Sequence, residues 1–171
     1  DTVNQSMLIE ILSRTIKDNR VISLIHKFLN AGIMDRGMFI KSDEGVPQGG
    51  PLSPLLANIM LNELDQKLDE WGYLYVRYAD DLLIFTKSKR AAERQYERAS
   101  KYIEGKLKLQ INREKTQISK LSQIRYLGYA FYKYGGKCRF RVHPKSIKRL
   151  KDKLRTATGR SNGMSIEGRK I

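Results

Sequence analysis

The chain has 171 residues, and 33 Lys or Arg against 18 Asp or Glu give it a formal net charge of +15 at pH 7. This length suits one compact domain or part of a larger protein. The single cysteine, Cys138, excludes an internal disulfide, and no run approaches the roughly 18 to 20 apolar residues that a membrane span needs. The composition therefore predicts a soluble intracellular protein with no membrane partner.

Apolar periodicity in the first half of the chain predicts helices interrupted by two hairpins. The expected elements are helices near 6–16, 20–29 and 54–71, a short hairpin about 35–37, and a second hairpin formed by strands 73–78 and 82–86. Ser53 followed by Pro54 is typical of a helix start, so Ser53 is expected to be the N-cap of the third helix.

The second half of the chain predicts one further helix, then mostly strands, then a basic helix. The expected elements are a helix near 89–107, strands 109–112, 124–132 and 138–142, and a helix beyond Pro144. Gly135-Gly136 is expected to turn the second of these strands into the third, which makes the pair a hairpin. In this last helix Ile147, Leu150 and Leu154 form one narrow apolar stripe, and most other positions are basic. The whole pattern predicts a mixed α/β (α+β) fold.

Two adjacent carboxylates, Asp80 and Asp81, fall at the bend of the second predicted hairpin. Neighbouring side chains of an extended strand point to opposite faces, so two consecutive carboxylates can approach one ion only where the chain turns. Close carboxylates repel one another unless a cation compensates, and such oxygen ligands suit Mg²⁺. The pair therefore favours a metal site, although Asp is also common in ordinary turns.

The loop 45–50 upstream of this hairpin is rich in glycine and leads into the helix that begins near Pro54. Glycine lets backbone approach a ligand closely, and a helix N-terminus favours phosphate. Gln48 adds a neutral amide. Such a loop is usually only a connector, but its pairing with the acidic hairpin indicates a site that handles nucleotides.

Charge is divided sharply along the chain. Residues 1–86 hold 8 Lys or Arg against 12 Asp or Glu, whereas residues 87–171 hold 25 against 6. Between Lys133 and Arg160, eleven basic residues are opposed by Asp152 alone. A basic field of this kind attracts nucleic acid, so the second half is predicted to bind a polyanion.

Taken together, these blocks resemble the reverse transcriptases encoded by bacterial and organellar group II introns. The resemblance runs through residues 45–65 (GVPQGGPLSPLLANIMLNELD), 76–82 (VRYADDL), 112–116 (NREKT), 126–129 (YLGY) and 161–165. It implies a polymerase palm of the reverse transcriptase type, with partial fingers helices and the beginning of a helical thumb. The implied domains are 1–50 for fingers and palm helices with their hairpin, 51–142 for the palm, and 143–171 for the start of a basic thumb.

The resemblance implies a role for particular side chains. Asp80 and Asp81 would hold two Mg²⁺ ions, with Mn²⁺ as an alternative, and Lys115 would lie near phosphate or primer, where an ordinary solvated lysine is equally expected. Template or nucleotide contacts are implied for Pro47, Gln48, Gly49 and Tyr78. The primer grip would be Tyr126, Leu127, Gly128 and Tyr129, and the basic nucleic-acid-binding face would be Lys145, Lys148, Arg149, Lys151, Lys153 and Arg155.

The implied function is RNA-directed DNA polymerisation by two-metal nucleotidyl transfer, with intron RNA as template, a DNA primer and dNTPs, in the bacterial cytoplasm. Such proteins also bind intron RNA and assist its splicing and mobility. The family uses a third catalytic carboxylate on an earlier strand, and residues 1–4 match the trailing end of that segment. We therefore expect the third Asp just upstream of Asp1, and expect the 171-residue chain alone to be inactive.

Two alternatives stay open at this stage. A catalytically silent RNA-binding module would also be basic and aromatic, but it has no need of Asp80 and Asp81, so Mg²⁺-dependent primer extension separates it. A retron or CRISPR-associated reverse transcriptase shares the acidic hairpin. The complete thumb and the domain after it distinguish that class.

Overall fold

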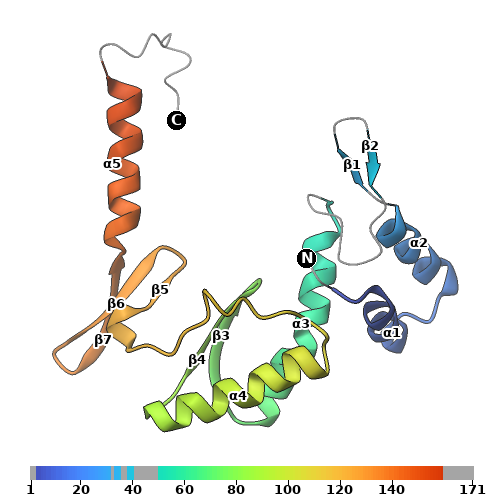
Figure 1. The fold of residues 1–171 in the computed structure, drawn as a ribbon, viewed down its shortest axis with the longest axis horizontal. Helices are drawn as coiled ribbons and strands as arrows, with labels where there is room; N and C mark the ends of the chain where they lie inside the picture. The colour runs from blue at the N-terminus through green and yellow to red at the C-terminus, as the bar shows by residue number, and fades with distance from the viewer. Residues whose placement is uncertain (1–2, 32, 36–37, 41–49, 160–171) are drawn as a thin grey trace. The chain divides into compact units, whose positions relative to one another are not determined.

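The computed structural model describes residues 3–31, 33–35, 38–40 and 50–159, which fall into two compact units, Asp1–Ile118 and Ser119–Ile171 (Figure 1). The mixed helix and strand content expected from the sequence is confirmed. Within the described residues, no helix is both long enough and apolar enough to cross a membrane.

The described part of the first unit contains four helices, all within about two residues of their predicted ends. They are α1 (Gln5–Thr15), α2 (Asn19–Asn30), α3 (Ser53–Glu70) and α4 (Lys89–Gly105). Short polar side chains start three of them: the oxygens of Asn4, Asp18 and Ser88 accept hydrogen bonds from backbone N–H groups of the first turn. Each bond satisfies a donor that has no partner within the helix.

The prediction that Ser53 is the N-cap of α3 is wrong. The N-cap is Leu52, which makes no side-chain capping bond, and Ser53 is the first helical residue and is buried. The reason is that the backbone turns earlier: Leu52 already has helical dihedral angles, and the Ser53 N–H donates to the Gly50 carbonyl at 3.2 Å.

Both predicted hairpins of the first unit are confirmed. Strands β1 (Ile33–Asp35) and β2 (Met38–Ile40) pair antiparallel, and so do β3 (Leu74–Tyr78) and β4 (Asp81–Phe85). The predicted strand 109–112 does not form. The Leu109 N–H donates to the Ile103 carbonyl of α4 at 3.1 Å, so the first residue of the predicted strand is bonded to the end of this helix.

Helix α3 supplies the centre of the hydrophobic core. Leu56, Met60, Leu64 and Leu68 recur every fourth residue and are almost completely buried. They pack with Leu8, Ile11 and Leu12 of α1, with Leu29 of α2 and with Leu107. Because α3 leads directly into the β3–β4 hairpin, this core fixes the base from which the acidic residues project.

The second unit is a three-stranded sheet followed by a helix. Its elements are a 3₁₀ turn η1 (Leu121–Gln123), strands β5 (Arg125–Tyr126), β6 (Tyr129–Tyr134) and β7 (Lys137–Val142), and helix α5 (Pro144–Thr158). The predicted strand 124–132 is broken, because Leu127 and Gly128 have φ of 49° and 84° and reverse the chain. The predicted Gly135-Gly136 turn and the basic helix are confirmed.

The apolar stripe of α5 is more exposed than its sequence suggests. Ile147, Leu150 and Leu154 are 42%, 56% and 43% exposed, and the helix has no buried residue. Substitutions on the described part of α5 therefore open no core.

Replacing Leu68 by Ala should lower the free energy of unfolding by about 3 to 5 kcal/mol, because it removes a fully buried side chain and leaves a cavity. Leu55→Ala on the same helix is the matched control, since Leu55 is 56% exposed. Its cost should stay within about 1 kcal/mol. Denaturant unfolding of both variants measures the difference, and equal losses would contradict the assigned core.

Candidate active site

The β3–β4 hairpin carries both predicted metal ligands at its tip. Tyr78 and Asp81 are the last paired residues, which leaves Ala79 and Asp80 as a two-residue loop. Ala79 has φ of 51°, a left-handed conformation that costs a non-glycine residue roughly 1 to 3 kcal/mol. Asp80 and Asp81 are both exposed. The tight turn is what places consecutive carboxylates at one end of the hairpin.

Arg77 ties this strained loop to helix α3. Its Nε donates to Asp65 Oδ1 at 2.8 Å, and its Nη2 donates to Asp65 Oδ2. Its Nη1 donates to Asn58 Oδ1 and to the carbonyl of Ala79, each at 2.9 Å. The two charged side chains are only 12% and 20% exposed. One guanidinium therefore joins the helix, the strand and the loop that presents Asp80, with the forked geometry that suits Arg–carboxylate pairs.

Tyr75 adds a second link between the same two elements. Its hydroxyl donates to the backbone carbonyl of Asp65 at 3.2 Å. Burial, followed by the nearby charges of Asp65 and Asp69, raises the pKa of Tyr75 above its ordinary value. The phenol therefore stays neutral and remains a hydrogen-bond donor at physiological pH.

The remaining predicted site residues of the first unit are not held in the Arg77 hydrogen-bond network. Tyr78 is 63% exposed at the end of β3. Lys115 is exposed in a turn, where its backbone N–H donates to the Asn112 carbonyl at 3.2 Å and to Asn112 Oδ1 at 3.1 Å. Pro47, Gln48 and Gly49 lie outside the described residues.

The Asn112 turn is attached to helix α4. Arg113 Nη2 donates to both carboxylate oxygens of Glu104, at 2.9 and 2.7 Å. Thr116 Oγ1 donates to the Asn112 carbonyl at 2.8 Å. The conformation of residues 112–116 is therefore set by local hydrogen bonds, with the Lys115 side chain left exposed.

In the second unit, the predicted primer-grip residues form the β5–β6 turn. Tyr126 pairs with Tyr129, and Leu127 and Gly128 both have positive φ, as in a type I′ hairpin. The Gly128 carbonyl accepts hydrogen bonds from the His143 N–H at 2.8 Å and from Ser146 Oγ at 3.2 Å. The start of α5 therefore holds this turn in place.

The six predicted basic residues of α5 are Lys145, Lys148, Arg149, Lys151, Lys153 and Arg155, and all are exposed. In the described part of the second unit the only acidic residue is Asp152, which lies 3.5 Å from Arg155. The electrostatic field around this helix is therefore strongly positive.

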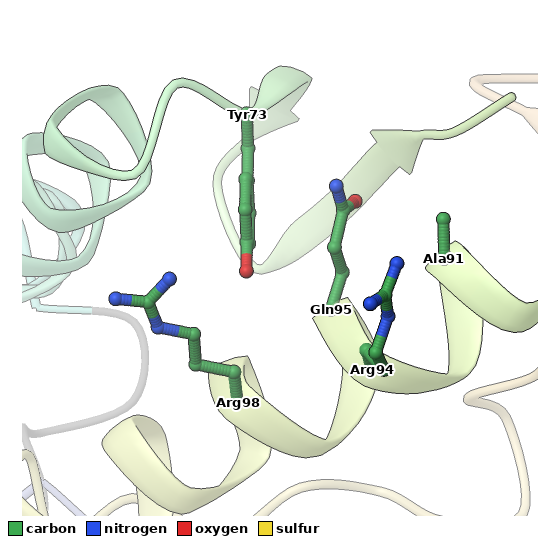
Figure 2. A pocket seen from close by; sticks show the side chains of 5 residues that line it. All are labelled: Tyr73, Ala91, Arg94, Gln95 and Arg98. Carbon is green, nitrogen blue, oxygen red and sulfur yellow. The ribbon is translucent and has the colours of Figure 1, made fainter.

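A pocket of about 370 Å³ lies beside α4 and was not predicted from the sequence (Figure 2). Tyr73 lines one side, and Ala91, Arg94, Gln95 and Arg98 line the other from successive turns of the helix. The Arg98 guanidinium lies 4.2 Å from the ring centroid of Trp71, a cation–π distance. The spacing of the two arginines was visible in the sequence, whereas the aromatic partners become apparent only in the fold.

The donor set at the hairpin tip fits a magnesium ion that is completed by substrate. Within the described residues, no group of three or more His, Cys, Asp or Glu side chains could hold a metal ion. Mg²⁺ commonly binds through only one or two carboxylates together with substrate phosphates. Two exposed, consecutive carboxylates meet that description.

An α+β unit with an acidic hairpin rising from a buried helix is the architecture of a polymerase palm. A family model, reverse transcriptase (RNA-dependent DNA polymerase), matches residues 1–131. The chain belongs to this family.

Two proteins and one solved structure illustrate what the chain is similar to. Protein YkfC of Escherichia coli K12 is 37% identical over 152 residues, covering 69% of this chain and 40% of YkfC. Group II intron-encoded protein LtrA of Lactococcus lactis subsp. cremoris is 31% identical over 194 residues, covering 75% of this chain and 32% of LtrA. A chain of a partial Cas6-RT-Cas1–Cas2 complex is 31% identical with a TM-score of 0.35, covering 67% of this chain and 20% of that one. The resemblance to group II intron-encoded proteins is confirmed, and the chain spans less than half the length of these relatives.

Replacing Asp65 by Asn should lower the free energy of unfolding by about 2 to 3 kcal/mol, because the largely buried Arg77 loses its charged acceptor. Glu70→Gln is the control on the same helix, since it removes an exposed pair with Lys67 and should cost less than about 1 kcal/mol. Chemical denaturation measures both. A cost for Asp65→Asn as small as for Glu70→Gln would show that the pair does not hold the hairpin.

Proposed function

We propose that this chain forms part of an RNA-directed DNA polymerase of the group II intron type, which extends a DNA primer on an RNA template by nucleotidyl transfer. The observation that carries the proposal is the acidic hairpin: Asp80 and Asp81 sit at a strained turn that Arg77 ties to the core helix. Membership of the reverse transcriptase family supports the reaction class.

In this proposal Asp80 and Asp81 hold Mg²⁺, or Mn²⁺ in its place. Bound metal ions of this kind activate an attacking hydroxyl and stabilise the charge that develops on a leaving phosphate group. The protein's part is to present the carboxylates in one fixed position. Arg77 does this through the Ala79 carbonyl, and the Asp65 pair keeps its guanidinium in place.

The remaining contacts are assigned to substrate and nucleic acid. Pro47, Gln48, Gly49 and Tyr78 contact template or incoming dNTP, and Lys115 lies near phosphate. The β5–β6 turn, residues 126–129, grips the primer. The basic face of α5 binds RNA phosphates, and with it the complete protein recognises structured intron RNA and assists splicing. The proposed domains are those implied by the resemblance: 1–50 for fingers and palm helices with their hairpin, 51–142 for the palm, and 143–171 for the start of the thumb.

Asp80→Asn in the complete protein should reduce Mg²⁺-dependent primer extension by at least about a hundredfold, because it removes a metal-ligand charge. RNA affinity should stay within about twofold, because the basic residues are unchanged. Glu93→Gln, an exposed charge-matched variant on α4, is the control and should extend normally. Extension by Asp80→Asn near the wild-type rate would refute the site, and activity without divalent metal would refute the mechanism.

Neutralising Lys148, Arg149, Lys151 and Lys153 to Gln should weaken RNA binding and flatten its salt dependence. Each lost phosphate contact should reduce the log-affinity slope by up to roughly 0.7 to 0.9. The fold should be retained, because no residue of α5 is buried. The matched control neutralises the exposed Lys87, Lys89, Arg90 and Lys101 of the first unit. An unchanged slope, with wild-type circular dichroism and melting, would show that α5 does not meet RNA.

A further inference from the structure

The β6–β7 hairpin sorts its side chains onto two chemically different faces. Paired residues share a face and successive residues alternate, so the register from Tyr129↔Val142 to Tyr134↔Lys137 fixes both sets. One face carries Ala130, Tyr132 and Tyr134 of β6 with Lys137, Arg139 and Arg141 of β7, and Ala130 is buried. We call the tyrosine, lysine and arginine side chains of this face the Arg–Tyr face. The opposite face carries Tyr129, Phe131, Lys133, Cys138, Phe140 and Val142.

On the Arg–Tyr face each arginine lies against a tyrosine. The Arg139 guanidinium carbon is 5.3 Å from the Tyr134 ring centroid, and that of Arg141 is 5.7 Å from the Tyr132 centroid. Both distances are within cation–π range. A guanidinium held against a ring keeps its N–H edges available to an acceptor. The face therefore presents both aromatic rings and guanidinium N–H groups that can donate to a ligand.

The Arg–Tyr face is mostly open and has no acidic neighbours on its own hairpin. Tyr134 is 67% exposed, Lys137, Arg139 and Arg141 are exposed, and Tyr132 is half-buried. Residues 119–159 contain one acidic residue, Asp152, which pairs with Arg155 on α5. The positive charge of this face therefore favours a polyanionic ligand. The tyrosine rings favour a polyanion whose unpaired aromatic bases can stack on them.

We propose that the Arg–Tyr face binds single-stranded RNA, with unpaired bases stacked on Tyr134 and Tyr132 and phosphates on Lys137, Arg139 and Arg141. Duplex bases are already stacked on one another, whereas bases of a single strand can be splayed onto aromatic side chains. This surface is separate from the β5–β6 turn and from the basic face of α5. It rests on the proposed function only in the choice of RNA as the polyanion.

The hairpin offers a closely matched pair of substitutions. Tyr134 and Phe140 are both aromatic and are 67% and 70% exposed, but they lie on opposite faces. Affinity for a fluorescein-labelled 12-nucleotide single-stranded RNA should fall about fivefold or more in Tyr134→Leu, the loss expected for one stacked base. Phe140→Leu should stay within about twofold. Equal losses in the two variants, or no loss in Tyr134→Leu, would overturn the proposal.

A second pair tests the charges with the fold held constant. Arg139→Gln removes a cation from the Arg–Tyr face, and Lys133→Gln removes one from the opposite face of the same hairpin. Arg139→Gln should weaken single-strand binding several-fold more than Lys133→Gln does, with circular dichroism and melting unchanged in both. If the two weaken binding equally, the hairpin contributes only general positive charge.

Two further probes identify the ligand class. Tyr134→Leu should leave affinity for a blunt RNA duplex of equal length within about twofold, because its bases cannot stack on the side chain. A Tyr134 dependence as large for duplex RNA, or poly-glutamate binding that Arg139→Gln abolishes while RNA binding is kept, would overturn the assignment. The proposed function and this proposal are tested by different measurements. Primer extension by Asp80→Asn tests the metal site and does not involve Tyr134, whereas the RNA affinity of Tyr134→Leu tests the Arg–Tyr face and does not involve Asp80.

Discussion

The Arg77–Asp65 pair is the interaction on which the acidic hairpin depends. A two-residue loop with Ala79 at positive φ is not a low-energy state for that residue, and it persists only where its surroundings over-determine it. Two hairpin strands alone are marginally stable in water. The guanidinium supplies what they lack: bonds to a carboxylate and an amide of α3, and one to the loop carbonyl.

The helix that receives these bonds is itself fixed by apolar packing. One face of α3 is buried through Leu56, Met60, Leu64 and Leu68, and Asp65 projects next to this buried stripe. The ion pair is thus largely shielded from water, where charged hydrogen bonds are stronger than at the surface. Core packing thus fixes helix α3, the helix fixes the Arg77–Asp65 pair, and that pair holds the strained turn that carries the proposed metal ligands.

Much of this could be predicted from sequence, and the failures have physical causes. Helices followed from apolar periodicity, and hairpins followed from short apolar and aromatic runs on either side of a bend, because both signals are local. The pairing of Arg77 with Asp65 joins a strand to a helix twelve residues away, and no local pattern encodes it. The strand expected at 109–112 does not form, and its first residue, Leu109, donates its N–H to the end of α4 instead, a contact that joins neighbouring segments and has no sequence pattern.

The break at 127–128 and the apolar stripe of α5 were misjudged for different reasons. Leucine is rare at positive φ, so Leu127 gave no turn signal, and the predicted strand ran through Gly128. The stripe on α5 has helical spacing, but spacing predicts which residues share a face and does not say what covers that face. Likewise, the sequence predicted strands in this region, whereas the contact of each arginine with a tyrosine depends on the β6–β7 register.

The double acceptance at the Gly128 carbonyl gives the second unit a mechanical property. Because His143 and Ser146 at the start of α5 both donate to that one oxygen, the turn and the helix cannot rotate independently without losing hydrogen bonds worth about 1 kcal/mol each. Helix α5 extends over fifteen residues from this attachment. A change in the direction of the helix axis would therefore also change the orientation of residues 127 and 128, or break these two hydrogen bonds.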